Sequence, residues 1–131
     1  MTAAIERAVQ TAIKLADQLQ EKSYTTSKAE WMLTDEMGLY IRAQKRFIAH
    51  QMREVITIAS IEVSPQFQRQ GLFKRLVERL DQVVRDKRMY ALVVESVLNP
   101  DLVVYLQNNG FEPVFADEPA PSYYRCVEQK Q

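Results

Sequence analysis

The spacing of apolar residues divides the first half of the chain into helical and extended segments. From Thr2 to Lys22, apolar residues recur every three or four positions, which predicts an amphipathic helix. From Leu39 to Ala49, apolar residues alternate with polar ones, which predicts one strand, or two strands joined near Gln44. One face of this segment, which includes His50, is expected to be exposed to solvent. Glu54 to Val63 is apolar or small on both faces over most of its length, as in a central strand covered on both sides.

Two local signals complete this half of the chain. Ser27 and Glu30 have the spacing of a capping box, which predicts a short second helix through Trp31 and Leu33 that ends before Gly38. The polar pair Arg53 and Glu54 is expected to mark the turn between the extended segments.

The second half of the chain predicts alternating helices and strands. Its expected elements are a helix from Leu72 to Lys87, a strand from Met89 to Val97, a short helix from Pro100 to Asn109, and antiparallel strands at Phe111 to Phe115 and Ser122 to Glu128. A strand, helix and strand joined this tightly predict a right-handed unit whose two strands are parallel.

Composition indicates an ordinary globular domain. The 131 residues suit one domain, and 17 basic residues balance 17 acidic ones, so no overall field favours nucleic acid. No apolar run is long enough to cross a membrane, and no secretory leader is evident, so we expect a cytoplasmic protein. Cys126 is alone, which excludes an internal disulfide and a cluster of zinc-binding thiolates; we expect a buried core thiol and no metal.

The stretch from Ile56 to Val84 carries the first chemical signal. An apolar strand ends before Pro65, a polar turn follows, and an amphipathic helix begins directly after Gly71. Such a junction aims free backbone N–H groups and the positive end of a helix dipole at one point, which suits a phosphate. An ordinary connection between a strand and a helix is the alternative. Seven basic and three acidic residues between Pro65 and Tyr90 favour a polyphosphate, although a solvated helix face explains the same imbalance.

Two motifs in this region resemble those of the GNAT superfamily of N-acetyltransferases. Gln68-Arg69-Gln70-Gly71-Leu72-Phe73 resembles the family's pyrophosphate loop, with Phe73 where a small residue is usual, and Glu95 to Phe111 resembles its second cofactor segment. The resemblance covers Ile56 to Phe111 and implies acetyl-CoA as the acetyl donor. It also implies an α/β fold with a mixed, mostly antiparallel sheet, a splayed parallel strand pair at its centre and flanking helices.

The resemblance assigns parts of the chain to cofactor binding. Residues 1–131 would form a single domain, with helices in residues 1–37 in place of the usual first strand and an acetyl-CoA-binding core in residues 54–111. Backbone groups at the end of the first parallel strand would hold the pantetheine arm, and the loop and helix start would hold the phosphates. The residues concerned are Ile61, Glu62 and Val63, then Arg69, Gln70, Gly71, Leu72, Phe73 and Lys74, with Asn99 as a further polar contact.

Acetyl transfer to an amine needs a base, and three residues are candidates. Glu95 is the first choice, because burial among valines at a strand end would raise the pKa of its carboxyl; a carboxylate that caps a nearby N–H is the alternative. Glu62 is the second choice, and His50 is more typical of a surface residue. For the acid that protonates the thiolate, the family often has a Tyr where this chain has Leu106, so the neighbouring Tyr105 is the candidate.

The expected function is direct transfer of the acetyl group from acetyl-CoA to a primary amine of a small molecule or protein. A catalytically weak CoA-binding or protein-interaction module on the same fold is the alternative, favoured by Phe73 and by the missing Tyr. A nucleic-acid adaptor using the basic helix is a weaker possibility. An unpaired sheet edge would favour a homodimer.

Overall fold

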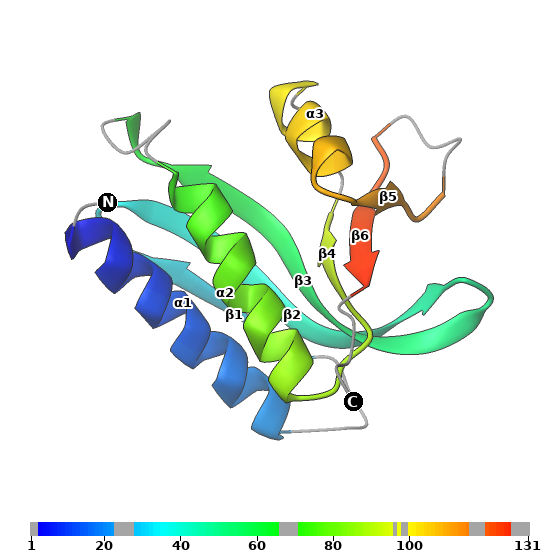
Figure 1. Cartoon of the computed structure of the whole chain (residues 1–131). Coiled ribbons are helices and arrows are strands. Elements are labelled where there is room, and N and C mark those ends of the chain that lie inside the picture. Colours follow the sequence, from blue (N-terminus) through cyan, green and yellow to red (C-terminus); the bar gives the residue numbers. More distant parts are fainter. Residues whose placement is uncertain are drawn as a thin grey trace.

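The computed structural model describes residues 3–22, 28–65, 71–95, 97, 100–115 and 120–126 (Figure 1). In chain order, its elements are α1 (Ala3–Lys22), β1 (Lys28–Leu33), β2 (Met37–Ile48), β3 (Gln51–Val63), α2 (Leu72–Asp86), β4 (Ala91–Val94), α3 (Pro100–Asn108), β5 (Glu112–Pro113) and β6 (Tyr123–Cys126). The strands form one sheet in the order β1-β2-β3-β4-β6-β5, in which only the central β3–β4 pair is parallel. The expected mixed sheet with a central parallel pair is confirmed.

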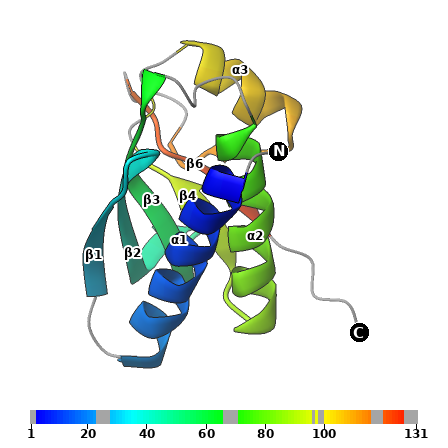
Figure 2. The same ribbon diagram turned by 90° about the vertical axis from the view of Figure 1, so that its left-hand side faces the viewer.

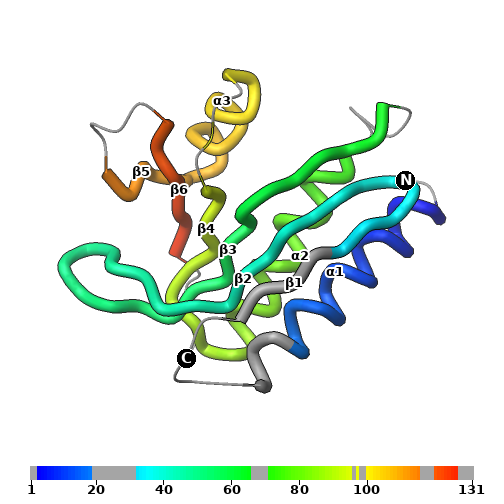
Figure 3. Tube along the Cα trace, turned by 180° about the vertical axis from the view of Figure 1, so that it is seen from behind, coloured from blue at the N-terminus to red at the C-terminus, as the bar shows by residue number. Residues whose placement is uncertain are grey.

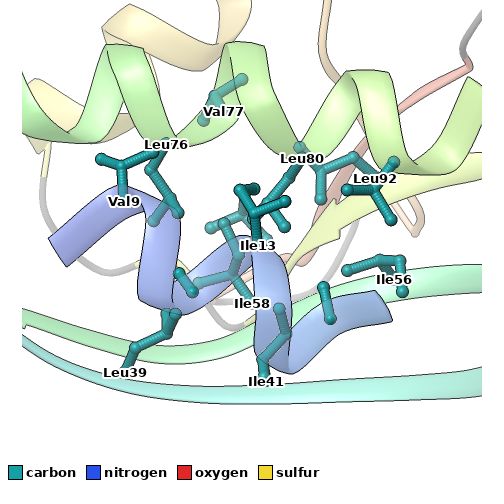
Figure 4. Close-up of a cluster of buried hydrophobic side chains, with 14 of the residues drawn as sticks. Val9, Ile13, Leu39, Ile41, Ile56, Ile58, Leu76, Val77, Leu80 and Leu92 are labelled. Atoms are coloured by element: carbon teal, nitrogen blue, oxygen red, sulfur yellow. The ribbon is translucent and has the colours of Figure 1, made fainter. Parts of the chain in front are cut away.

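Helices α1 and α2 lie side by side across one face of the sheet (Figures 1 and 2). The apolar stripe of α1 includes Val9 and Ile13, which lie between Leu76 and Leu80 of α2 and the strands in Figure 4. A fully buried aliphatic side chain of this kind stabilises a fold by about 1.5 to 3 kcal/mol. The amphipathic patterns of residues 2–22 and 72–87 therefore correctly predicted two helices with buried apolar sides.

The segment through Trp31 is a strand, so the predicted second helix is wrong. β1 pairs antiparallel with β2, with Trp31 opposite Tyr40. The Thr34 hydroxyl accepts hydrogen bonds from the backbone N–H groups of Glu36 and Met37 and closes the turn between the strands. Long-range pairing with β2 outweighs the local capping signature, whose Ser27 lies outside the described residues. In place of the helices expected in residues 1–37, the structure therefore describes one helix and one strand before β2 begins at Met37.

The hairpin between β2 and β3 turns at Ala49 and His50, so the turn predicted at Arg53 and Glu54 is wrong. Both turn residues have positive φ, 52° and 68°, as a two-residue hairpin turn requires. β2 is one continuous strand, but its buried side changes near the turn. Phe47 is 49% exposed, whereas Ile48 is buried against the opposite face of the sheet, contrary to the expected alternation.

The second half of the chain follows the predicted order with shorter strands. β4 covers only Ala91–Val94 of the strand expected from Met89 to Val97, while α2 and α3 end within one residue of their predicted ends. β5 and β6 form the expected antiparallel pair; β5 is shorter than predicted, β6 begins one residue later than predicted, and Val127 and Glu128 lie outside the described residues. Gly110, with φ of +84°, follows α3 in the left-handed conformation that commonly ends a helix.

Candidate active site

The two parallel strands separate where β4 ends. Their pairing runs from Val55 opposite Ala91 to Ile58 opposite Val94, and the N–H of Glu95 donates to the carbonyl of Ile58. β3 continues to Val63, and over this stretch β2 is its strand partner among the described residues, so β3 and β4 diverge (Figure 3).

A bulge in β3 lies at the point of divergence. Tyr40 pairs with Ser60 and Ile41 pairs with Ile58, which leaves Ala59 as an extra residue in β3. A bulge of this kind bends a strand and commonly occurs beside functional sites. The edge of β3 that faces the gap carries Ile61, Glu62 and Val63, the residues expected to hold the pantetheine arm.

The start of α2 forms an open cradle. Gly71 precedes the helix with φ of +80°, and a Cβ added there would meet no atom of the described residues within 4 Å. The first helical turn has no acidic residue, and Gly71 makes no side-chain capping bond, so the first N–H groups of α2 face this space. Gln68, Arg69 and Gln70, which the sequence assigns to the same loop, lie outside the described residues.

A cavity of about 470 Å³ adjoins this helix start. It is lined by Glu6, Gly71, Lys74, Arg75 and Glu78. Arg75 donates to Glu6 of α1 across 2.9 Å and lies 3.6 Å from Glu78, whereas Lys74 is exposed. Open space, backbone donors and two cationic side chains fit the phosphates of a CoA molecule. The carboxylate of Glu6 competes with such an anion for Arg75.

Phe73 does not crowd the cradle. Its half-buried side chain packs against the core, and its ring meets the ring of Tyr105 edge to face at 5.6 Å and 74°. The contact places Tyr105 of α3 beside the first turn of α2. Burial raises the pKa of Tyr105 above its ordinary value of 10.0 and outweighs the opposing effect of Arg125, so the hydroxyl keeps its proton at neutral pH.

Glu95 does not lie in the apolar setting expected from the sequence, because β4 ends one residue before it. Nη1 of Arg42 lies 3.0 Å from both carboxylate oxygens of Glu95, and Nη1 of Arg46 lies 2.9 Å from Oε2. Nη2 of Arg46 donates to the buried Ser122 hydroxyl at 3.2 Å. The side chains of Arg42, Arg46 and Glu95 remain 30%, 25% and 23% exposed. We call these three residues the Arg42–Arg46–Glu95 cluster.

The two arginines of this cluster were not predicted from the sequence. Both belong to the face of β2 that carries Tyr40, Arg42, Gln44 and Arg46; buried residues alternate with this face as far as Gln44, whereas Arg46 lies between exposed residues. The polar positions along this segment were the signal available in the sequence, but they do not show that the side chains of Arg42 and Arg46 reach Glu95 at the end of β4.

The other candidate site residues lie at different places relative to the point where β3 and β4 separate. Glu62 is exposed on β3, four residues beyond the last parallel pair. His50 is exposed at the hairpin turn, at the opposite end of β3 from the divergence. Asn99 lies outside the described residues. Glu95 and Glu62 are thus the candidate bases that the structure places at the divergence.

Cys126 is exposed, so its predicted role as a buried core thiol is wrong. It is the last residue of β6 and pairs with Ala91 at the start of β4, where the pairing of these two strands ends. Among the described residues, no group of three or more side chains is arranged to hold a metal ion. No helix in the described segments has the length and apolarity needed to cross a membrane.

Most of the chain matches the model of a known protein family. Residues 13–111 match the model of the acetyltransferase (GNAT) family. No curated protein matches the chain.

Solved structures share the fold at low sequence identity. The "putative acetyltransferase from Agrobacterium tumefaciens" is 14% identical, with 96% of this chain and 93% of that chain covered and a TM-score of 0.57. The KacTA–DNA complex contains a chain that is 17% identical, with 92% and 80% covered and a TM-score of 0.54. AtaT complexed with acetyl-methionyl-tRNAfMet gives 15% identity, 70% and 62% coverage and a TM-score of 0.57. The match thus spans about three-fifths of the length of AtaT.

Proposed function

Because the chain belongs to the acetyltransferase (GNAT) family, whose members use acetyl-CoA, we propose that it transfers the acetyl group directly to a primary amine. The acceptor is a small molecule or a protein amine. One observation carries the proposal: the splayed end of β3 leads within eight residues to the open start of α2, where Lys74 and Arg75 lie beside the first backbone N–H groups. The continuous segment from β3 to α2 would then hold both ends of acetyl-CoA, the thioester beside β3 and the phosphates at α2.

Each part of the site has a role in the proposed reaction. Backbone groups of Ile61, Glu62 and Val63 hold the pantetheine arm along β3, and the N–H groups of Leu72, Phe73 and Lys74 bind the phosphates. Arg69, Gln70 and Asn99 are further proposed contacts. Bound acetyl-CoA supplies the activated acetyl group.

The proton transfers are assigned to side chains near the gap. The amine nitrogen forms a bond to the acetyl carbon, and the carbon–sulfur bond breaks. Glu95, or Glu62 as the second choice, accepts the proton lost by the amine, directly or through water. Tyr105, which stays protonated at neutral pH, donates a proton to the departing thiolate. No covalent intermediate on the protein is required.

The test combines acetyl-CoA titration with steady-state kinetics on a broad amine panel. The panel includes an aminoacyl-tRNA, because the similar structure of AtaT holds acetyl-methionyl-tRNAfMet. We expect Glu95→Gln to lower kcat by about a hundredfold or more with an unchanged Kd for acetyl-CoA. Glu62→Gln should have a smaller effect, and Tyr105→Phe should lower kcat while keeping its ring contact with Phe73.

Two outcomes would contradict this assignment in different ways. Acetyl-CoA binding without turnover of any amine would support the alternative, a CoA-binding or protein-interaction module. A larger loss of kcat in Glu62→Gln than in Glu95→Gln would transfer the role of base to Glu62.

A further inference from the structure

The Arg42–Arg46–Glu95 cluster has a position and a charge that bear on the acceptor. Arg42 and Arg46 lie on the face of β2 opposite the one that Leu39 and Ile41 turn toward the core under α1 and α2, and both contact Glu95 there. In Figure 3 no described helix lies over β2 and β3 on that side. The side chains are between 23% and 30% exposed, so a molecule approaching this face can touch them. Glu95 is also the first residue after β4, at the edge of the gap between the parallel strands.

The charges of the cluster do not cancel. Two guanidinium groups share one carboxylate, which leaves one unit of positive charge in excess. Arg53, which pairs with Arg46 in the neighbouring strand, adds a third guanidinium that lies over the Tyr90 ring, 4.3 Å from its centroid. A local positive field disfavours a protonated amine and favours the neutral amine, which is the nucleophilic form.

The same field attracts a negative group on the acceptor. A guanidinium has five N–H donors, and its charged hydrogen bonds to carboxylates and phosphates are among the stronger ones in proteins. The hydrogen bonds of Arg46 to Glu95 and Ser122 hold its guanidinium in place, so little conformational entropy remains to be lost on binding. Arg42 is held in turn by Glu95 and by the ring of Tyr40, 5.1 Å away.

Resting on the proposed function, we infer that the acceptor is a primary amine whose own molecule carries a carboxylate or phosphate, and that Arg42 and Arg46 bind this anionic group. The amine reaches the gap beside Glu95 while the anion lies over β2. The transfer itself is unchanged: the amine nitrogen gains the acetyl carbon and loses a proton, and CoA leaves as the thiol. Arg42 and Arg46 are thus specificity residues of the acceptor site.

Matched acceptors test the inference directly. A series of ω-amino carboxylates of increasing chain length is compared with the corresponding ω-amino carboxamides, which keep the amine and lose the charge. Ethanolamine phosphate is compared with ethanolamine, which distinguishes a phosphate site from a carboxylate site. We expect kcat/KM to favour the charged member of at least one pair by about tenfold or more, mainly through KM.

Two variants assign this preference to the cluster. Arg42→Gln should remove most of the preference by raising KM for the charged acceptor, while acetyl-CoA affinity stays unchanged. Arg79→Gln is the matched control, because Arg79 bonds Gln10 on the helix-covered side and should keep the full preference. Measuring each variant with the neutral acceptors separates loss of anion binding from a displaced Glu95, which would lower kcat for both members of a pair.

Three results would contradict the inference, and they can be told apart. Equal kcat/KM for charged and neutral members in the unmodified protein would overturn the inference and leave the acetyltransferase proposal standing. A preference that survives Arg42→Gln and Arg46→Gln would also overturn it. Bound acetyl-CoA with no turnover of any amine would overturn the proposed function, and the inference with it.

Discussion

Gly71 allows the phosphate cradle to be tested separately from the stability of the fold. An L-residue in the left-handed conformation costs about 1 to 2 kcal/mol, and Gly71 has φ of +80°. Gly110 is a matched control with φ of +84°, where an added Cβ would lie 3.6 Å from Cδ of Arg125, an ordinary contact distance. Gly71→Ala and Gly110→Ala should therefore each lower Tm by roughly 3 to 10 °C.

Acetyl-CoA affinity should distinguish the two positions. Gly71→Ala adds a methyl group and backbone strain at the helix start, and should weaken binding by several fold, whereas Gly110→Ala should leave Kd unchanged. Gly71→Glu adds a negative charge as well. At a separation of about 6 Å from one phosphate charge, the repulsion is about 0.7 to 2.8 kcal/mol for effective dielectric constants of about 80 to 20. This corresponds to a further loss of about three- to hundredfold.

The assay is isothermal titration with acetyl-CoA at low and high salt, beside thermal unfolding of each variant. The additional loss in Gly71→Glu should shrink at high salt, because screening weakens an exposed charge pair. Equal losses of affinity in Gly71→Ala and Gly110→Ala, or an unchanged Kd in Gly71→Glu, would refute the assignment of the phosphates to α2.

Two further predictions concern charged pairs on α2. Glu6→Gln should strengthen acetyl-CoA binding about two- to fivefold in low salt, because it releases Arg75 from its 2.9 Å ion pair beside the cradle; Asp17→Asn on the same helix is the control, and an unchanged Kd in Glu6→Gln would refute competition by Glu6. Burial raises the pKa of Asp81 above 3.8 despite the opposing contact with Arg125, so this group stabilises the folded state fully below that pH and loses the contribution as pH rises through its raised pKa. Unfolding titrations from pH 3 to 7 should therefore show Asp81→Asn gaining stability relative to the unmodified chain as pH rises; a constant or opposite difference would contradict the raised pKa.

The features predicted well from the sequence are those that depend on periodicity within one segment. The apolar stripes through Val9 and Leu80 predicted both long helices and the side of each helix that is buried. The close succession of strand, helix and strand predicted the parallel pairing of Ile58 with Val94, because few connections allow any other topology.

The failures depend on contacts between distant segments. Trp31 follows a helix-capping pattern, yet pairing with Tyr40 makes it part of a strand. Glu95 has apolar neighbours in sequence, but its partners are Arg42 and Arg46, more than forty residues away. Cys126 resembles a core residue in the sequence, but the register of β6 places it, exposed, at the end of the pairing with β4. No spacing rule within one segment contains this information.

The packing of α1 against α2 has a consequence for how the chain folds during synthesis. The two helices pack face to face, with Glu6 bonded to Arg75, so about seventy residues of chain must follow the start of α1 before its partner exists. The β2–β3 hairpin needs only its own short turn at Ala49 and His50 and can form earlier. An isolated helix of this length is marginal in water. The part of the apolar stripe of α1 that packs on α2 therefore stays open to chaperones or to other nascent chains until α2 has been made, whereas the part that packs on β1 and β2 can be covered earlier. The parallel pairing of β3 with β4 comes later still.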